Sequence, residues 1–217
     1  MIIKSFELEK LKSTQSNIHL IYGNNEGIKK DIIEKYYLKN FEGTILRYEE
    51  QEILSKKDEF ISSLLTKSLF DDKKVVIVSR STDKIINIIE DVLIRSNIET
   101  KIIIKSPALE KKSKLRNLFE KGDKVICTPV YQDDNRSLNL IIENFLKNHK
   151  LSLSQEIKNI LIERSQGDRI NLKNELSKLS NLLITRNNIG IKDVLKLSNL
   201  SENYSVFELS DNYLAKN

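Results

Sequence analysis

The stretch that decides the fold is IYGNNEGIKK, residues 21–30. It follows an apolar run and leads into a segment whose apolar residues recur at three- and four-residue spacing. Such a pattern predicts a β-strand, a short loop and an α-helix in direct succession. Nucleotide-binding proteins place their phosphate loop at the same kind of junction. The first question is therefore whether this loop still holds a nucleotide.

The loop matches only part of the phosphate-loop pattern, which is glycine, four residues, glycine, lysine, and serine or threonine. Gly23 stands at the first glycine position and Lys29 at the lysine position. Ile28 replaces the second glycine, and Lys30 replaces the hydroxyl residue that would bind magnesium. Gly27 lies one place early, where it could partly restore the turn. We interpret Gly23, Gly27 and Lys29 as a degenerate phosphate loop in an ordinary strand–helix turn.

Apolar runs alternate with helical periods through about the first 145 residues. The predicted strands are short and continuously apolar, as in a parallel sheet that is covered on both faces; they are 18–23, 44–48, 74–79, 101–105 and 124–128. The predicted helices between them are 28–39, 52–66, 83–95 and 109–120. Strands that alternate with helices imply βαβ units. We therefore predict an α/β domain over residues 1–135.

Beyond Pro129 the strand pattern stops and only helical spacing remains. The helical stretches are 136–150, 153–167, 168–183 and 190–200. They predict a small helical lid domain over residues 136–203. One stretch should pack inward through Leu172, Leu176 and Leu179 and leave Arg169, Lys173 and Glu175 exposed. Residues 204–217 begin another apolar helical pattern without a stop signal, so we expect the natural chain to continue.

Composition excludes several classes of protein. The single cysteine, Cys127, leaves no internal disulfide and no cysteine-built metal site. Neither His19 nor His149 has a metal-binding motif around it, and we predict no metal. No stretch approaches the roughly 18 apolar residues of a membrane helix, and the charged N-terminus does not resemble a secretory signal. We therefore expect a cytoplasmic protein without membrane contact.

One segment is more basic than the net charge of +5 requires. Residues 101–124 hold eight lysines and arginines against three acidic residues. A basic face can contact a phosphate backbone. The candidate DNA contacts are Lys111, Lys112, Lys114 and Arg116. Ordinary solvated side chains remain the alternative, because no aromatic residues or base-reading motif accompany them.

An α/β sheet followed by a small helical lid is the layout of AAA+ ATPases. Hydrolysis of ATP requires carboxylates at the end of an apolar strand to hold magnesium and to polarise water. The predicted strand ends at 79–80, 105–106 and 128–129 carry none, and Asp71 and Asp72 precede their strand. With the loop and the strand ends both defective, we expect no intrinsic enzyme activity and no cofactor.

Together these features resemble the delta subunit of the bacterial DNA polymerase III clamp loader, along almost the whole chain. The segments that carry the resemblance are IYGNNEGIKKDIIEK, SLFDDKKVVIV, PALEKKSKLRNLFEKG with VICTPVY, and ERSQGDRINLKNELSKLSNLL. The resemblance implies an AAA+ fold without ATPase activity in a subunit of the DNA-directed DNA polymerase holoenzyme. The implied partners are the beta sliding clamp, the ATPase and delta-prime subunits, and primer–template DNA through the complex. Residues 204–217 would begin a truncated C-terminal collar.

The resemblance also implies a binding site for the clamp. Leu69 and Phe70 fall on the connection between a predicted helix, with Ile53, Phe60, Ile61, Leu64 and Leu65 facing inward, and the strand at 74–79. From spacing alone the two residues could be a buried pair at the helix end. Delta subunits present a Ser-Leu-Phe stretch here, which implies that Ser68, Leu69 and Phe70 bind the clamp so that its ring is opened. The alternatives are an active AAA+ ATPase and a nucleic-acid-binding module that uses residues 101–124.

Overall fold

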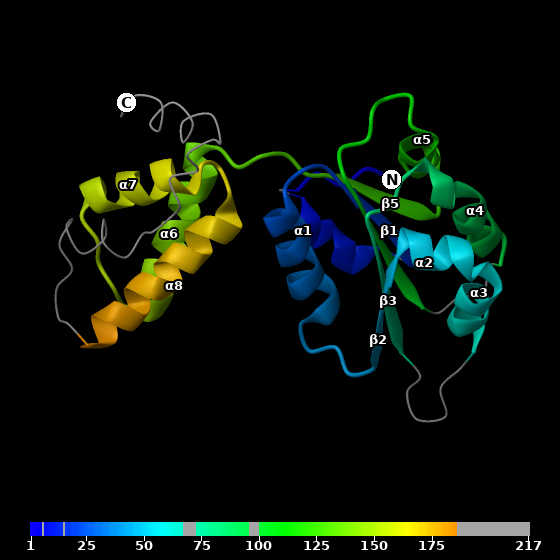
Figure 1. Ribbon diagram of the computed structural model, residues 1–217, viewed down its shortest axis with the longest axis horizontal. Coiled ribbons are helices and arrows are strands. Elements are labelled where there is room, and N and C mark those ends of the chain that lie inside the picture. Colours follow the sequence, from blue (N-terminus) through cyan, green and yellow to red (C-terminus); the bar gives the residue numbers. More distant parts are fainter. Residues whose placement is uncertain (6, 15, 67–72, 96–99, 186–217) are drawn as a thin grey trace, which may run out of the picture. The chain divides into compact units, whose positions relative to one another are not determined.

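A computed structural model describes residues 1–185, apart from residues 6, 15, 67–72 and 96–99 (Figure 1). The chain divides into two compact units, Met1–Tyr131 and Gln132–Asn217. We call the first the sheet unit and the second the helical unit. The predicted helix at 190–200 and the predicted collar segment 204–217 lie outside the described residues. No helix within the described ranges is long and apolar enough to cross a membrane.

The sheet unit is built on five parallel strands in the order β2-β3-β4-β1-β5. Their bounds are β1 (Ile18–Tyr22), β2 (Thr44–Glu49), β3 (Lys74–Ser79), β4 (Lys101–Ser106) and β5 (Val125–Pro129). In the register, Leu20 of β1 lies opposite Ile104 of β4 and Cys127 of β5. The predicted α/β class is confirmed. The chain runs from β1 to the far edge and returns through β3 and β4 before it adds β5 on the other side. This reversal of strand order beside β1 is where open α/β sheets bind ligands, outside the carboxyl ends of their strands.

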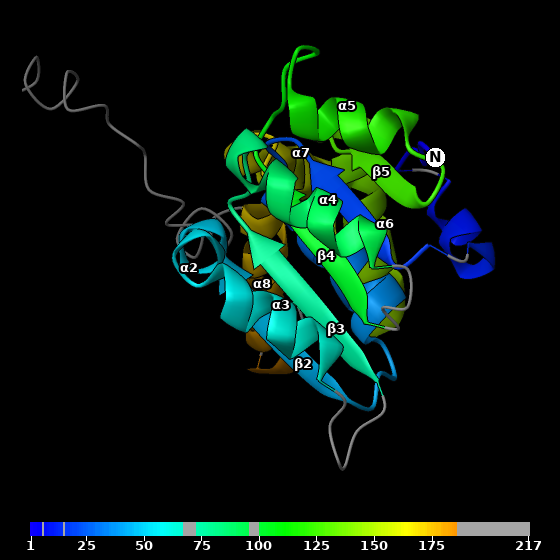
Figure 2. The same ribbon diagram turned by 90° about the vertical axis from the view of Figure 1, so that its right-hand side faces the viewer.

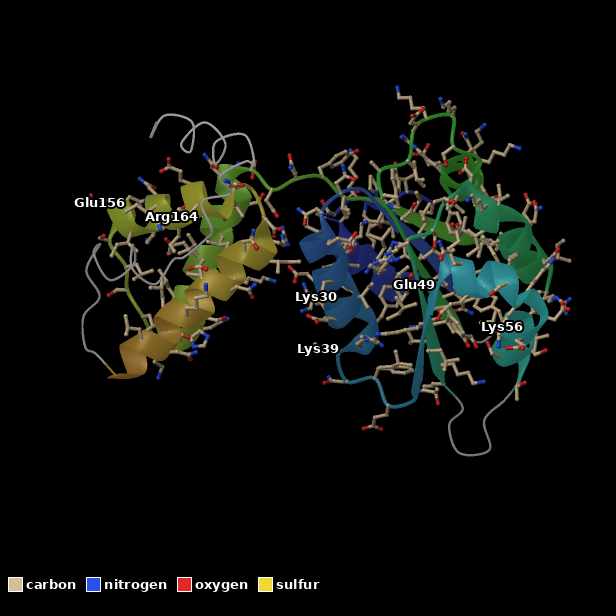
Figure 3. The ribbon with its side chains drawn as sticks, in the orientation of Figure 1. Lys30, Lys39, Glu49, Lys56, Glu156 and Arg164 are labelled. Carbon is tan, nitrogen blue, oxygen red and sulfur yellow. The ribbon has the colours of Figure 1, made fainter. Side chains whose placement is uncertain are left out.

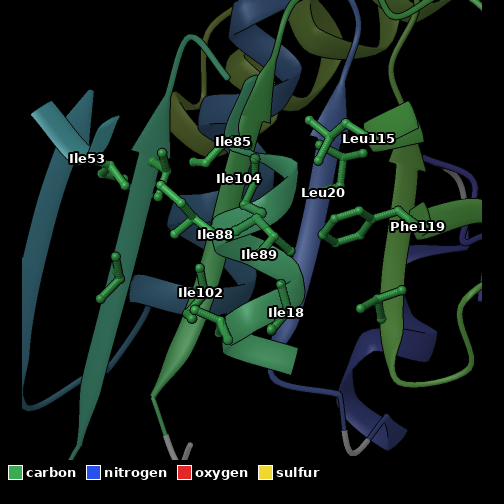
Figure 4. Close-up of a cluster of buried hydrophobic side chains, with 14 of the residues drawn as sticks. Ile18, Leu20, Ile53, Ile85, Ile88, Ile89, Ile102, Ile104, Leu115 and Phe119 are labelled. Atoms are coloured by element: carbon green, nitrogen blue, oxygen red, sulfur yellow. The ribbon is translucent and has the colours of Figure 1, made fainter. Parts of the chain in front are cut away.

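Both faces of the sheet are covered by helices, which explains the continuous apolar runs of β3 and β4 (Figures 1 and 2). One face packs Leu20, Ile102 and Ile104 against four helices (Figure 4). These are α2 (Glu50–Ser55), α3 (Lys57–Leu65), α4 (Ile86–Ile94), preceded by the short turn η3 (Asp83–Ile85), and α5 (Lys114–Lys121). The other face packs Ile21 and Ile103 against η1 (Leu8–Ser13), α1 (Glu26–Ile33) and its π-helical extension η2 (Glu34–Leu38).

The first two predicted helices differ from the observed ones. The helix predicted at 28–39 starts earlier, because the Asn25 side chain accepts a hydrogen bond from the N–H of Ile28 and so caps α1. The helix predicted at 52–66 is two helices. They are separated at Lys56, whose φ of −133° and ψ of 50° are not helical. Hydrophobic spacing is continuous across this break, so periodicity alone did not reveal it.

The helix predicted at 109–120 begins only at Lys114. Ser113 caps it, and the carboxylate of Asp83 accepts hydrogen bonds from the backbone N–H of Lys114 and of Leu115. Asp83 lies about thirty residues earlier in the chain, so the start of α5 depends on a contact that no local window contains.

The helical unit contains α6 (Asn135–His149), α7 (Gln155–Ser165) and α8 (Arg169–Thr185). Leu172, Leu176 and Leu179 are buried in its core, as predicted. Glu175 was predicted to be exposed, and that prediction is wrong because only 2% of its side chain is accessible. Lys178, one turn further along α8, holds the Glu175 carboxylate at 2.6 Å. The pairing with Lys178 on the same helix thus allows the Glu175 carboxylate to be buried on the core-facing side of α8.

Candidate functional site at the degenerate phosphate loop

The loop after β1 is fixed to the loops after β4 and β5. Gly23 has a φ of +134°, and its N–H donates to the carbonyl oxygens of Ser106 and Pro107, both at 3.2 Å. A Cβ at this position would lie 1.9 Å from the carbonyl oxygen of Val130. Glycine is therefore required here by the backbone conformation and by close packing between loops. A bound phosphate is not needed to explain it.

Two asparagines complete the closure of the loop. Asn24 Oδ1 accepts from the N–H of Ala108 at 3.2 Å, while Asn25 Oδ1 accepts from the N–H of Ile28 at 2.9 Å. Asn25 Nδ2 also donates to the carbonyl oxygen of Tyr131 at 2.9 Å. A phosphate cradle works by pointing backbone N–H groups at its ligand. The N–H groups of Gly23 and Ile28 are instead engaged within the protein.

Lys29 occupies the lysine position of the motif, but it points into the protein. Its side chain is 1% exposed, and its Nζ lies 2.7 Å from Glu26 Oε1 and 2.6 Å from the carbonyl oxygen of Ser106. Burial lowers the pKa of the Lys29 ammonium, and the hydrogen bond to Glu26 opposes that shift. The ammonium that would meet a phosphate is already paired with a carboxylate.

Glu26 also holds a second lysine. Its Oε2 lies 3.3 Å from Nζ of Lys105, near the end of β4. Burial alone would raise the pKa of the Glu26 carboxyl, but the hydrogen bond from Lys29 and the charge of Lys105 hold it below its ordinary value. We call Glu26, Lys29 and Lys105 the Glu26 ion cluster.

The remaining motif positions behave as parts of a helix. Gly27 lies in the first turn of α1, and its expected part in the turn of the loop stays a prediction. Ile28 packs against the core on the α1 face of the sheet. Lys30 is exposed on α1 and lies 3.8 Å from Glu34 (Figure 3). Neither residue contributes a ligand to the loop.

The end of β2 carries two carboxylates that the expectation from the sequence did not include. Glu49 and Glu50 follow directly after its apolar residues, and this acidic pair was the signal that could have found them. Glu50 is buried and accepts hydrogen bonds from the N–H of Thr82 at 2.6 Å and from its hydroxyl at 2.9 Å. Glu49 begins α2 with a capping box and lies 3.2 Å from the Arg80 guanidinium (Figure 3). Both carboxylates therefore support connections between elements.

The lysines proposed to contact DNA lie at the start of α5. Lys111 and Lys112 are exposed on the turn before it, and Lys114 is exposed as its first residue. Lys112 also lies 3.0 Å from the carboxylate of Glu110. Their exposure is compatible with contact to a phosphate backbone, and a role in DNA binding stays a prediction.

Arg116 has a different environment from these lysines. Its guanidinium donates to Glu120 Oε1 at 2.8 Å and to the carbonyl oxygen of Leu109 at 3.1 Å. It also lies over the ring of Tyr22, 5.3 Å from the centroid. These contacts tie α5 to β1, so Arg116 has a structural role that the basic pattern did not reveal.

The predicted clamp-binding residues Ser68, Leu69 and Phe70 lie outside the described residues, but both ends of their connection are described. Leu65, the last residue of α3, is 48% exposed, so its predicted inward orientation is wrong. Lys74 begins β3, and its Nζ donates to the carbonyl oxygens of Ser63, at 3.2 Å, and Thr66. This connection enters the amino end of β3, whereas the Gly23 loop follows the carboxyl end of β1. In a parallel sheet the amino ends and the carboxyl ends of the strands lie on opposite sides of the domain.

Arg169, in the helical unit, was predicted to be a solvated residue, and that prediction is wrong. Its side chain is only 15% exposed, and its guanidinium holds both oxygens of Asp133, with Nε 2.7 Å from Oδ2. The ion pair joins the first residues of the helical unit to the start of α8.

No protein-family model and no curated protein sequence matches this chain. Solved structures do match it. The DNA clamp loader delta protein of Bacillus subtilis aligns with 95% of the chain, with a TM-score of 0.59 and 16% identity. The RuvB Holliday junction branch migration motor of Thermotoga maritima aligns with 89% of it, with a TM-score of 0.55 and 16% identity. The chain spans 66% and 65% of the lengths of these two proteins. At such identities the likeness concerns the fold, and the chain has an α/β, AAA+-like fold.

Proposed function

We propose that this chain is a non-catalytic clamp-loader subunit that binds the beta sliding clamp and opens its ring during DNA replication. The observation that carries the proposal is the buried Lys29 ammonium, which is paired with Glu26 in an AAA+-like sheet unit. The lysine that would bind a phosphate is already neutralised by a carboxylate. A chain of this fold with such a lysine is therefore better suited to assist ATP-hydrolysing subunits than to hydrolyse ATP itself. The fold similarity to a clamp loader delta protein, together with the Ser-Leu-Phe stretch at residues 68–70, supports the choice of this partner.

Opening of the ring would follow from differential binding. A ligand shifts an equilibrium only by its difference in affinity for the two states, so the subunit must fit an open clamp interface better than a closed one. Leu69 and Phe70 would supply the anchor by entering an apolar pocket on the clamp. The ATP-hydrolysing subunits, which assemble with this chain and a delta-prime subunit, would supply the nucleotide-driven steps that this chain does not perform.

The anchor is tested by the double substitution Leu69→Ala and Phe70→Ala. Truncation of two central apolar contacts costs about 2–4 kcal/mol each, so we expect clamp affinity to fall by at least about a hundredfold in surface plasmon resonance. Leu140→Ala is the matched control, because Leu140 is a 57% exposed apolar residue on α6 of the helical unit. Unchanged affinity in a folded double variant would remove this site. Loss of the circular dichroism signal would show instead that the pair belongs to the core.

The absence of catalysis is tested by ATP binding. Because the N–H groups of Gly23 and Ile28 and the ammonium of Lys29 are engaged within the protein, we expect no heat of binding when ATP and magnesium are titrated into the chain. We also expect no release of phosphate on incubation with ATP. Micromolar, magnesium-dependent binding would contradict this prediction and favour the active ATPase alternative.

A further inference from the structure

The Glu26 ion cluster places a carboxylate beside the lysine that a phosphate loop would use to hold its ligand. We propose that Glu26 is a built-in substitute for the nucleotide phosphate, which keeps the loop closed without any ligand. The negative charge that AAA+-like modules obtain from a bound nucleotide would here be part of the chain.

The first support is the burial of Lys29. An ammonium that is 1% exposed must be compensated by an anion and by further hydrogen bonds, because an unpaired buried charge is strongly unfavourable. Glu26 Oε1 at 2.7 Å supplies the anion, and the carbonyl oxygen of Ser106 at 2.6 Å supplies the second acceptor. The lysine is therefore stably buried only while a negative charge lies beside it.

The second support is the way in which the carboxylate is shared. Its two oxygens contact different lysines, Lys29 of α1 and Lys105 of β4, at 2.7 and 3.3 Å. A phosphate group can bridge two cations in the same way, because a different oxygen contacts each cation. Glu26 thus links the helix that follows β1 to the end of β4, and the contacts of Gly23 and Asn24 with residues 106–108 run alongside this link.

A neighbouring pair, formed by Lys30 of α1 and Glu34, the first residue of η2, has no buried member. Lys30 and Glu34 lie 3.8 Å apart, with side chains 66% and 58% exposed. Glu26 has the same 58% exposure as Glu34, but its lysine partner is buried. Exposed pairs contribute little to stability, whereas removal of one partner of a buried charge is costly.

The inference deepens the non-catalytic part of the proposed function, but it does not depend on clamp binding. The experiment therefore measures thermal unfolding only. The full chain, Glu26→Ala and Glu34→Ala are compared in sodium chloride and in sodium tripolyphosphate at matched ionic strength. Tripolyphosphate supplies the charge and geometry of a nucleotide's phosphates without the base or sugar.

In chloride we expect Glu26→Ala to lower the Tm by roughly 4–8 °C, because Lys29 loses its anion, and Glu34→Ala to change it by about 1 °C or less. Tripolyphosphate should restore most of the loss in Glu26→Ala, since an added anion that binds the folded state stabilises it. It should leave the parent chain and Glu34→Ala unchanged.

A double variant assigns the effect to the buried ammonium. Replacing both members of a buried pair by uncharged groups removes the penalty of the unpaired charge. Glu26→Ala combined with Lys29→Met should therefore regain most of the Tm in chloride and should not respond to tripolyphosphate. A response that survives in the double variant would place the anion elsewhere and overturn the proposal.

Three further results would also overturn it. One is an unchanged Tm in Glu26→Ala, and another is a loss of Tm that is equally large in chloride and in tripolyphosphate. The third is failure of Glu26→Ala to fold in either salt, because an external anion could then not replace the carboxylate. If the parent chain bound the clamp while the unfolding experiment gave any of these results, the inference would fail and the proposed function would stand.

Discussion

His19 shows how a single buried residue makes the stability of this protein depend on pH. It lies on β1 with 1% exposure, its Nδ1 is 2.5 Å from the Tyr37 hydroxyl, and its Nε2 is 2.7 Å from the Thr128 hydroxyl. Burial lowers the pKa of the imidazole to about 3. Between about pH 6.5 and pH 3 the ring is therefore neutral in the folded state, although the unfolded chain protonates it.

We predict that the folded state loses about 2 kcal/mol of stability between pH 7.5 and pH 5 because of His19. The unfolded state binds a proton below its ordinary pKa of 6.5, whereas the folded state does not bind one until about 3. The contribution of His19 is thus complete above pH 6.5 and is lost as the pH falls from 6.5 toward 3. Urea unfolding at the two pH values should show this loss in the parent chain and not in His19→Gln.

His149, on the C-terminal turn of α6, is the natural control. It is exposed, so His149→Gln should keep the full loss of stability between the two pH values. An equal loss in the parent chain and in His19→Gln would mean that other groups set the pH dependence.

At the scale of elements, the pair Asp133 and Arg169 joins the segment before α6 to the first residue of α8. The Asp133 carboxylate is 1% exposed, and it accepts two hydrogen bonds from the Arg169 guanidinium. We predict that Asp133→Ala destabilises the helical unit by about 3–5 kcal/mol, because the guanidinium is left in a site that is largely closed to water. Urea unfolding followed by circular dichroism measures this change.

A double-mutant cycle separates the pair from other contacts of its members. Asp133→Leu combined with Arg169→Met should cost much less than Asp133→Ala alone, because no buried charge remains unpaired. The matching single variants are Asp133→Leu and Arg169→Met. If the stability lost in the double variant equalled the sum of the losses in these two, the residues would act independently. The ion pair would then contribute no coupling energy to the stability of the helical unit.

The elements also show what the sequence could and could not predict. All five strands were predicted close to their observed bounds. The clearest signals were continuous apolar runs such as 75–78 and 102–104, which are buried on both faces. The start of α5 was missed, because it depends on Asp83 from a distant turn. The break at Lys56 was missed because the apolar spacing continues through it.

The sequence likewise predicted only part of the candidate site. The residues that would make a phosphate loop, and the defects at Ile28 and Lys30, were visible in the sequence. The partners of Lys29 were not, because Ser106 lies 77 residues away and Glu26 appeared to be an ordinary acidic residue at a helix start. Residue identity shows which groups are missing from a motif, but only the folded chain shows what has replaced them.

At the scale of the whole molecule, the two units have separate cores. The clusters of the sheet unit draw on residues from Ile3 to Val130, and the cluster of the helical unit draws on residues from Leu138 to Leu179. A cut after Tyr131 therefore removes no member of the sheet unit's core. It also keeps the hydrogen bond from Asn25 to the carbonyl oxygen of Tyr131. A domain of this size buries enough apolar surface to fold by itself.

We accordingly predict that residues 1–131 fold cooperatively and bind the clamp as tightly as the full chain does. The proposed anchor at Leu69 and Phe70 belongs to this unit, and binding should need only a correctly placed connection between α3 and β3. The measurements are thermal unfolding and surface plasmon resonance of residues 1–131, with residues 132–217 as the matched fragment that should not bind. The double substitution of Leu69 and Phe70 should abolish binding in the fragment as it does in the full chain. A folded 1–131 fragment with clamp affinity at least about tenfold weaker would show that the helical unit takes part in the interface.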